Sequence, residues 1–131
     1  MNTRDKLFQL AQQARQNAYA PYSEFAVGTA ILSTNGNYYS GCNVENISYP
    51  CGTCAEQGAI SAMIAGGDRK IAEIMIIADT KELISPCGAC RQRIKEFTTP
   101  QSIIYVANLQ GQHRQYTTEQ LLPDGFAAKE I

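Results

Sequence analysis

Cysteines are the residues of this sequence whose type and spacing can do chemistry. Four of the five cysteines form two Cys-x-x-Cys pairs, Cys51 with Cys54 and Cys87 with Cys90, while Cys42 stands apart. An odd number of cysteines argues against a disulfide framework, and we expect Cys42 to be a small packed side chain. The paired spacing is typical of metal binding or of thiol chemistry.

Three of these thiols lie at the starts of predicted helices. One helix is expected to begin at Cys54 and another at Gly88, directly after Pro86 and Cys87. The positive end of a helix dipole lowers the pKa of a thiol, and the thiolate is the form that binds zinc. Three thiolates, from Cys54, Cys87 and Cys90, leave a tetrahedral zinc ion one open position for water, whose pKa falls to about 7.

Glu56 supplies the proton-transfer group that such a site needs. It lies two residues after Cys54, in the first turn of the same predicted helix. Its carboxylate can take a proton from the attacking water, pass it to a ring nitrogen and then protonate a leaving amine. Cys-x-Glu followed by Pro-Cys-x-x-Cys is the pattern of zinc deaminases, so the motif predicts hydrolytic removal of an amino group from a base.

A closed structural zinc site is the alternative interpretation. It would use Cys51, Cys54, Cys87 and Cys90, as in a non-catalytic, zinc-stabilised interaction module. Such a site gives no role to Glu56, and neither does a redox Cys-x-x-Cys. A chain of 131 residues can also bury a sufficient core without a metal. We therefore favour the open, hydrolytic site.

Hydrophobic periodicity and turn residues indicate the elements that position these side chains. A stripe of apolar residues predicts a helix over residues 3–17, which Thr3 can cap. Thr53 can cap the helix from Cys54 to Ala65, and Asn35-Gly36 is a strong hairpin signal. The remaining expected elements are strands over 25–32, 37–44, 71–78, 102–107 and 112–116, and helices over 88–97 and 118–122.

This order of elements predicts an α/β fold. A helix between two buried strands implies that the two strands are parallel. We expect a three-layer α/β/α sandwich with a mixed sheet of about five strands. Residues 1–131 are expected to form a single domain.

Charge and hydropathy exclude several classes of partner. The formal net charge is -1, and the densest basic cluster is only residues 91–95, so no basic stripe is available for a nucleic acid polymer. No apolar run reaches the ~18 residues of a membrane span. The first residues lack the apolar core of a signal peptide, and His113 is expected at the surface. We expect a cytoplasmic protein without membrane contacts.

Over nearly its whole length, the chain resembles the small, homotetrameric, zinc-dependent cytidine deaminases. The resemblance is carried by residues 19–28, 41–46, 48–50, 54–56, 85–92 and 119–123. It implies a cytidine deaminase-like domain with one zinc ion per chain. It also implies hydrolysis of cytidine and deoxycytidine to uridine and deoxyuridine, with release of ammonia, in pyrimidine salvage.

The resemblance further implies contacts to a small nucleoside substrate. Asn43 and Glu45 match a pair that hydrogen-bonds to the ribose 3′-hydroxyl, and Phe25 matches an aromatic side chain that lines the base. The backbone around Ala55 and Ser85 is expected to contact the polar edge of the pyrimidine and the leaving amine. Without the resemblance, Asn43 and Glu45 would be assigned to an ordinary polar loop and Phe25 to the core.

Two aromatic residues are implied to act between subunits. Phe126 matches a C-terminal aromatic residue that reaches the site of a neighbouring subunit, and Tyr49 matches a residue offered across an interface. Taken alone, an aromatic residue near a C-terminus more often docks the tail. With sites shared in this way, activity would require the homotetramer.

Two positions depart from the family pattern. Members with three cysteine ligands usually carry arginine directly after the catalytic glutamate, where this chain has Gln57. Zinc with three thiolates keeps a net negative charge that an arginine would offset, so we predict that Gln57→Arg raises turnover or lowers the pH that activity requires. Cys51 replaces a more usual aliphatic residue, and we expect a small apolar side chain there. Because of Gln57, a modified cytidine or a cytosine nucleoside antibiotic stays open as the substrate.

Overall fold

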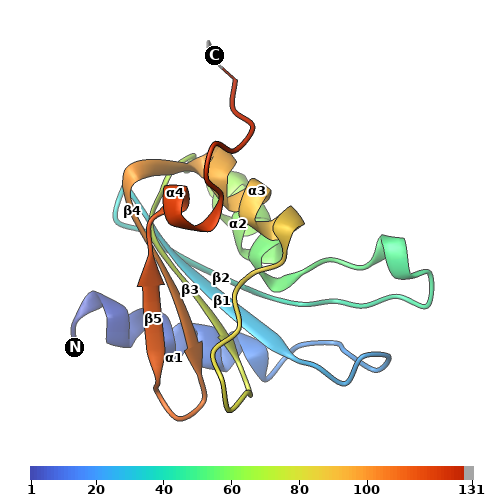
Figure 1. The fold of residues 1–131 in the computed structure, drawn as a ribbon. Helices are drawn as coiled ribbons and strands as arrows, with labels where there is room; N and C mark the ends of the chain where they lie inside the picture. Colours follow the sequence, from blue (N-terminus) through green and yellow to red (C-terminus); the bar gives the residue numbers. More distant parts are fainter. Residues whose placement is uncertain (129–131) are drawn as a thin grey trace.

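The computed structural model describes residues 1–128 and forms one mixed sheet covered by helices on both faces (Figure 1). None of the helices in that range is long and apolar enough to cross a membrane. In chain order the elements are α1 (Thr3–Arg15), β1 (Val27–Ser33), β2 (Tyr38–Cys42), the 3-10 helix η1 (Tyr49–Cys51), α2 (Ala55–Ala65), β3 (Ile71–Ala78), α3 (Gly88–Phe97), β4 (Thr98–Asn108), β5 (His113–Tyr116) and α4 (Thr118–Leu121).

The five strands lie in the order β2-β1-β3-β4-β5. Only β3 and β4 pair in parallel, and α3 forms the crossover between them, as the strand–helix–strand order predicts. The other pairs are antiparallel. The β1–β2 hairpin turns at Asn35-Gly36, where Gly36 adopts a φ of 89° that glycine tolerates without strain.

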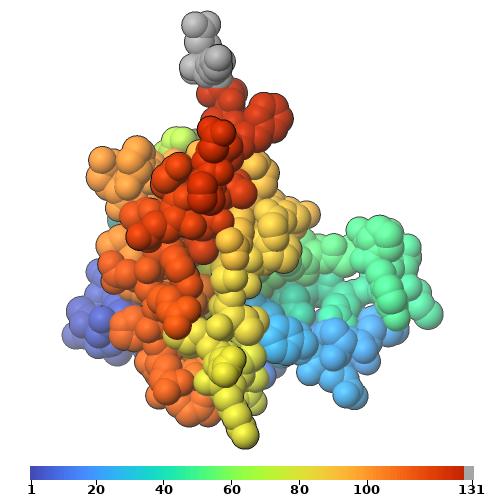
Figure 2. Space-filling view, viewed as in Figure 1, coloured from blue at the N-terminus to red at the C-terminus, as the bar shows by residue number. Residues whose placement is uncertain are grey.

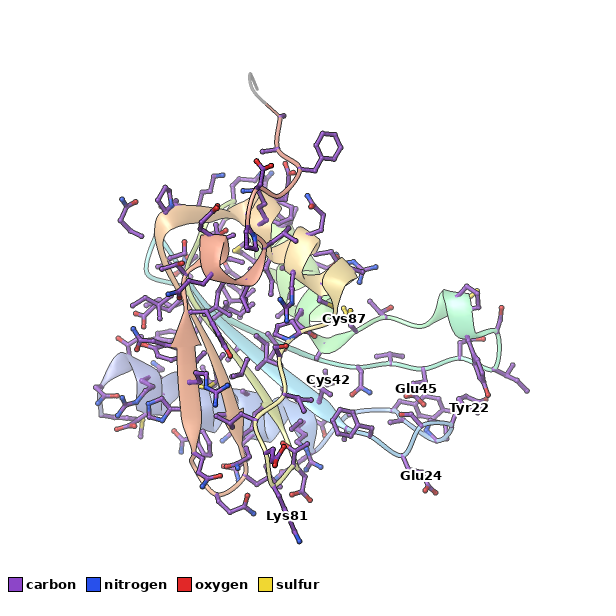
Figure 3. The ribbon with its side chains drawn as sticks, in the orientation of Figure 1. Tyr22, Glu24, Cys42, Glu45, Lys81 and Cys87 are labelled. Carbon is purple, nitrogen blue, oxygen red and sulfur yellow. The ribbon has the colours of Figure 1, made fainter. Side chains whose placement is uncertain are left out.

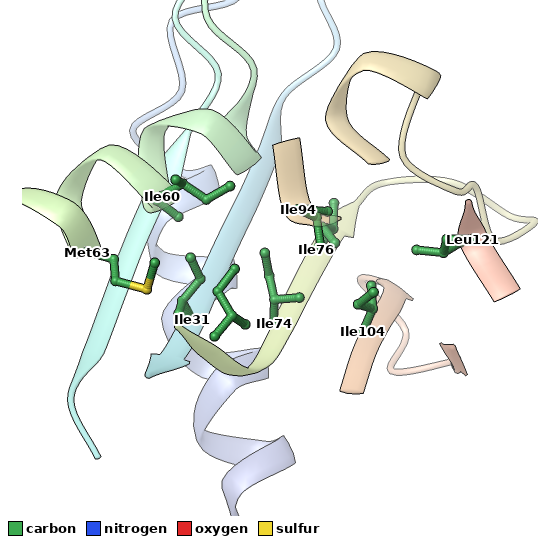
Figure 4. Close-up of a cluster of buried hydrophobic side chains, with 10 residues drawn as sticks. Ile31, Ile60, Met63, Ile74, Ile76, Ile94, Ile104 and Leu121 are labelled. Carbon is green, nitrogen blue, oxygen red and sulfur yellow. The ribbon is translucent and has the colours of Figure 1, made fainter. Parts of the chain in front are cut away.

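Two hydrophobic clusters hold the three layers together. α1 packs on one face through Leu7 and Ala11, which lie against Met75 and Ile77 of β3. On the other face, α2, α3 and α4 bury a second cluster against the sheet (Figure 4). The alternating residues of β3 thus serve both faces, which is why its sequence is apolar at every position except Glu73. The predicted three-layer α/β fold is confirmed.

Several element ends differ from the prediction, each for a local reason. Asn2 rather than Thr3 caps α1, since its side chain accepts a hydrogen bond from the Asp5 N–H at 2.8 Å. Cys54 rather than Thr53 caps α2, through its sulfur. β4 starts at Thr98, directly after α3, instead of at residue 102. The polar residues at its start carry no alternating pattern that would indicate a strand.

Two segments beside β1 and β2 project from the body of the molecule, and we call them the arm: residues 19–26 and 43–53. Figure 2 shows the arm in blue and green, extending to one side of the compact sandwich. Backbone hydrogen bonds join the two segments, because the Tyr19 N–H donates to the Asn43 carbonyl and the Glu45 N–H to the Tyr19 carbonyl. The second segment then leads directly into α2.

Candidate metal centre and substrate pocket

The first turns of α2 and α3 bring two thiols together at one end of the sandwich. Cys54 caps α2, and Cys90 lies in the first turn of α3, which Cys87 caps. The Cys90 thiol donates to the Cys54 sulfur at a distance of 2.8 Å. Both caps accept backbone hydrogen bonds, Cys54 from Gln57 at 3.4 Å and Cys87 from Cys90 at 3.5 Å. Each helix start therefore presents a sulfur with backbone donors aimed at it.

These contacts favour thiolate at Cys54. The hydrogen bond from Cys90 lowers the pKa of Cys54 to about 6, and the Gln57 N–H and Arg93 act in the same direction against burial. The same hydrogen bond, together with burial, raises the pKa of Cys90. This one hydrogen bond therefore moves the pKa values of the two thiols in opposite directions.

Glu56 lies beside the two sulfurs and is almost fully buried. Its residue is 5% exposed. A carboxylate oxygen of Glu56 and the sulfurs of Cys54 and Cys90 lie within 4.8 Å of one another. Burial, as the largest cause, raises the pKa of Glu56. A raised pKa makes a carboxyl group a better proton acceptor, which is the property that a general base requires.

The donor atoms fit zinc. Sulfur ligands at helix starts, with a carboxylate beside them, are the donor types that zinc prefers. The structure brings together Cys54, Glu56 and Cys90 as the group able to hold a metal ion. Of the residues predicted from the motif, Cys87 lies outside this group. It caps α3 with its side chain exposed, at the end of the helix that faces α2 (Figure 3).

The other two cysteines also lie outside the group. Cys51 lies in η1 on the arm, is exposed, and donates its thiol to Ser48 Oγ at 3.5 Å. Cys42 ends β2 and is half-buried. The grouping of Glu56 with the sulfurs, and the position of Cys51 on the arm, argue against a closed four-cysteine site.

A pocket of about 470 Å³ opens between the arm and the metal centre. Cys54, Ala55 and Glu56 line it from the first turn of α2, while Asn43, Glu45 and Tyr49 line it from the arm. This volume suits a small molecule of nucleoside size. Of the other predicted substrate residues, Phe25, Ser85 and Phe126 do not line this pocket in the described chain.

Asn43 and Glu45 use their polar atoms to shape the arm. Asn43 Oδ1 accepts from the Val27 N–H at 2.9 Å, and its Nδ2 donates to the Phe25 carbonyl at 2.8 Å. Glu45 Oε1 accepts from the N–H groups of Tyr22 and Ser23 at 3.0 and 3.1 Å, and the Ser23 hydroxyl bonds to its other oxygen. These bonds, the Ser23 hydroxyl first, lower the pKa of Glu45 and keep it ionised.

Aromatic side chains gather on the arm above the pocket. The Tyr22 and Tyr49 rings lie 6.0 Å apart and tilted, and Figure 3 shows Tyr22 beside Glu45. Phe25 is 38% exposed and Tyr49 74% exposed. Phe126 lies outside the arm, in the segment after α4, and is 84% exposed. Its backbone carbonyl accepts a hydrogen bond from Gln92 Nε2 at 3.0 Å.

The loop before α3 is held by Arg91. Its guanidinium donates to the Pro86 carbonyl at 2.8 Å, to Ser85 Oγ at 2.5 Å and to the Leu121 carbonyl at 2.7 Å. The Ser85 side chain thus faces Arg91.

Arg93 is a site residue that the motif analysis did not identify. Its Nη1 donates to Cys54 Sγ at 3.4 Å and to Cys90 Sγ at 3.7 Å. Gln57, by contrast, sends its side-chain amide to Ser61 Oγ at 3.0 Å. The sequence feature that could have identified Arg93 is its spacing from Cys90. Residues three apart on a helix share a face, and Arg93 follows Cys90 by three.

A mixed α/β sandwich with sulfur ligands and a buried carboxylate beside a nucleoside-sized pocket defines a metal-dependent hydrolase. Comparison with known proteins narrows this class. Residues 1–107 match the model of the cytidine and deoxycytidylate deaminase zinc-binding region. The chain belongs to this family of zinc-dependent deaminases.

Two relatives and a solved structure are similar to this chain along nearly its full length. A cytidine deaminase from Sporosarcina psychrophila is 40% identical over 127 residues, which cover 97% of this chain and 93% of the relative. One from Halalkalibacterium halodurans is 41% identical, with 98% and 97% covered. A crystal structure of cytidine deaminase from Burkholderia pseudomallei superposes with a TM-score of 0.90 at 41% identity, covering 96% of this chain and 100% of that one.

Proposed function

We propose that this chain hydrolyses cytidine and deoxycytidine to uridine and deoxyuridine, with release of ammonia, in cytoplasmic pyrimidine salvage. The observation that carries the proposal is the grouping of a buried carboxylate, Glu56, with two thiols at the base of a nucleoside-sized pocket. A full-length likeness to cytidine deaminases supports the choice of substrate.

Cys54, Cys87 and Cys90 would hold one zinc ion per chain. Cys54 and Cys90 are already hydrogen-bonded to each other. Cys87 lies at the start of α3, as Cys90 does, and its sulfur accepts a backbone hydrogen bond. When bound, zinc supplies a Lewis acid that activates water at neutral pH. With three protein ligands, the site keeps the open position that hydrolysis needs.

Glu56 moves the protons of the reaction. Its carboxylate accepts a proton from the attacking water and delivers it to the pyrimidine ring nitrogen. It then takes the proton of the hydroxyl added to the ring carbon and gives it to the amino group, so that the carbon–nitrogen bond breaks, ammonia leaves and the carbonyl forms. Burial raises the pKa of Glu56, which makes its carboxylate a stronger proton acceptor. A single carboxylate on a rigid helix start can serve each step in turn.

The arm binds the nucleoside. Asn43 and Glu45 face the pocket with hydrogen bonds that fix their positions, so each can engage a ribose hydroxyl with little loss of side-chain freedom. Phe25 would contact the base, as would the backbone around Ala55 and Ser85. The small pocket and the net charge of -1 favour a free nucleoside over a polymer.

A homotetramer with shared sites would complete the pocket. The arm exposes a cluster of apolar side chains, among them Ile47 at 78% and Tyr49 at 74%, and the tail exposes Phe126. Exposed apolar groups gathered on a projecting segment are typical of an interface. In this arrangement Phe126 and Tyr49 reach the sites of neighbouring subunits.

The test is product formation from three substrates. The zinc-loaded chain is incubated with cytidine, with deoxycytidine and with a cytosine nucleoside modified on the sugar, and uracil nucleosides and ammonia are measured. We expect conversion of the first two. Turnover of the modified nucleoside alone would identify the antibiotic or modified-cytidine alternative. Zinc retention without turnover of any of them would support the non-catalytic module.

A further inference from the structure

Arg93 places a positive charge on the sulfurs of the metal centre. One guanidinium nitrogen lies 3.4 Å from Cys54 Sγ and 3.7 Å from Cys90 Sγ. Within residues 1–128, it is the one cationic side chain that hydrogen-bonds to these sulfurs. Arg93 follows Cys90 by one helical turn on α3, so the helix that supplies a ligand also supplies the cation.

The metal centre has an excess of negative charge for this cation to offset. Zinc with three thiolates keeps one net negative charge, and the buried carboxylate of Glu56 lies within 4.8 Å of the sulfurs. α2 supplies no side-chain cation in return, since the residue after Glu56 is Gln57 and its amide is bonded to Ser61. Hydrogen bonds from a charged donor to thiolate are stronger than those from a neutral amide.

We propose that Arg93 is the charge-balancing residue of the zinc site, supplying from α3 the positive charge that α2 lacks at Gln57. The proposal deepens the function given above and rests on zinc being held by Cys54, Cys87 and Cys90. Arg93 does not line the pocket, so it acts through the sulfurs and is a positioning residue. Its presence also reduces the gain expected from Gln57→Arg alone.

We expect the site to lose zinc more readily when the positive charge of Arg93 is removed. Outer-shell partners of metal ligands are worth about 10–100-fold in metal affinity or activity. Because Arg93 is exposed, the lower part of that range is expected at physiological ionic strength. A purely mechanical role for the side chain would not depend on salt.

The test follows transfer of zinc from the loaded full-length chain to a chromogenic chelator. The variants are Arg93→Gln, Arg93→Lys, and Arg93→Gln combined with Gln57→Arg. Arg114→Gln is the matched control, because Arg114 is an exposed arginine on β5. The second readout is the split between kcat and KM for cytidine.

We expect Arg93→Gln to release zinc about tenfold faster than the wild type, by a ratio that shrinks as salt is raised. Its kcat should fall with KM unchanged. Arg93→Lys and the double variant should each recover retention, and Arg114→Gln should match the wild type. The role of Arg93 would be overturned if Arg93→Gln released zinc at the wild-type rate. It would also be overturned if neither Arg93→Lys nor the double variant recovered zinc retention. A wild type that holds no zinc would overturn the proposed function as well.

Discussion

At the scale of single residues, the substrate pocket depends on carboxylates and amides whose positions are fixed before a ligand arrives. Glu45 is tied to Tyr22 and Ser23, and Asn43 to the backbone of Phe25 and Val27. Fixed polar groups lose little freedom on binding, so their hydrogen bonds contribute more to affinity.

Glu45 can be tested with a paired change in enzyme and substrate. Glu45→Gln should lower kcat/KM for cytidine by roughly 10–100-fold, the range for losing a hydrogen bond to a charged group. With 3′-deoxycytidine, which lacks the hydroxyl, the same variant should lose much less. Equal losses on both substrates would mean that Glu45 shapes the arm without contacting the sugar.

The residues that sequence reasoning found differ in kind from those it missed. Cys54, Glu56 and Cys90 are brought together as expected, because helix starts and short spacings fix them locally. Arg93 could not be identified in this way, since a basic residue on an exposed helix face is usually solvated. Its contact with Cys54 depends on how α3 packs beside α2, which is a tertiary property.

At the scale of elements, close packing of α2 on β2 positions the metal centre. Gly41 of β2 lies against α2, and a Cβ there would meet the Ala59 nitrogen and lie 2.7 Å from the Gly58 carbonyl carbon. The two elements therefore approach too closely for any side chain at this position. Since α2 begins at the metal centre, a shift of the helix would move Cys54 and Glu56 together.

Gly41→Ala should therefore be costly. We expect about 1–3 kcal/mol of destabilisation from overpacking, measured by urea unfolding. Gly88→Ala is the control, because nothing lies within 4 Å of a Cβ at Gly88. If the two variants unfold at the same urea concentration, the close packing of β2 on α2 does not limit stability.

A buried carboxylate fastens the β1–β2 hairpin to the loop after α2. Asp68 is 6% exposed and accepts hydrogen bonds from Asn35, Asn37, Ser33 and Tyr39. These donors, Asn35 first, hold the pKa of Asp68 well below its usual range. The carboxylate of Asp68 thus binds a proton less readily in the native state than in the unfolded chain.

The sign of the resulting pH effect follows from that depressed pKa. The stabilisation is present above the unfolded pKa of about 4 and is lost as the pH falls below it. Asp68→Asn should lower the thermal midpoint at pH 7 and flatten its decline between about pH 5 and 3. Asp79→Asn, at an exposed aspartate, is the control. A wild-type pH slope retained in Asp68→Asn would contradict this assignment.

The elements themselves were predictable to different degrees. β3 and α3 match their expected bounds, because one is a nearly continuous apolar run, interrupted only by Glu73, and the other starts directly after Pro86 and Cys87. The start of β4 was missed, since Thr98 pairs with Ile71 across an irregular register that sequence alone does not reveal.

At the scale of the whole molecule, the arm and the tail both expose aromatic side chains to solvent. Phe126 is 84% exposed and does not line its own chain's pocket. If these groups complete neighbouring sites, a monomer lacks part of the substrate pocket, and assembly and activity are linked.

Complementation between two inactive variants tests this sharing. Phe126→Ala should lose activity while keeping zinc, and Glu56→Gln supplies an intact tail. Co-expression of the two should restore activity in roughly a quarter of the sites, where Glu56 of one chain meets Phe126 of another. Mixed assemblies no more active than either parent would show that Phe126 does not serve a neighbour.

In the proposed reaction, Glu56 carries out proton transfer beside zinc during the deamination of cytidine. The most direct measurement follows the loss of cytidine absorbance with wild-type and Glu56→Gln proteins that hold equal amounts of zinc. We predict steady conversion by the wild type and a loss of about 100-fold or more in Glu56→Gln, the usual contribution of a general acid–base group. A zinc-loaded wild type that leaves cytidine unchanged, or a Glu56→Gln variant that converts cytidine at the wild-type rate, would contradict this role of Glu56.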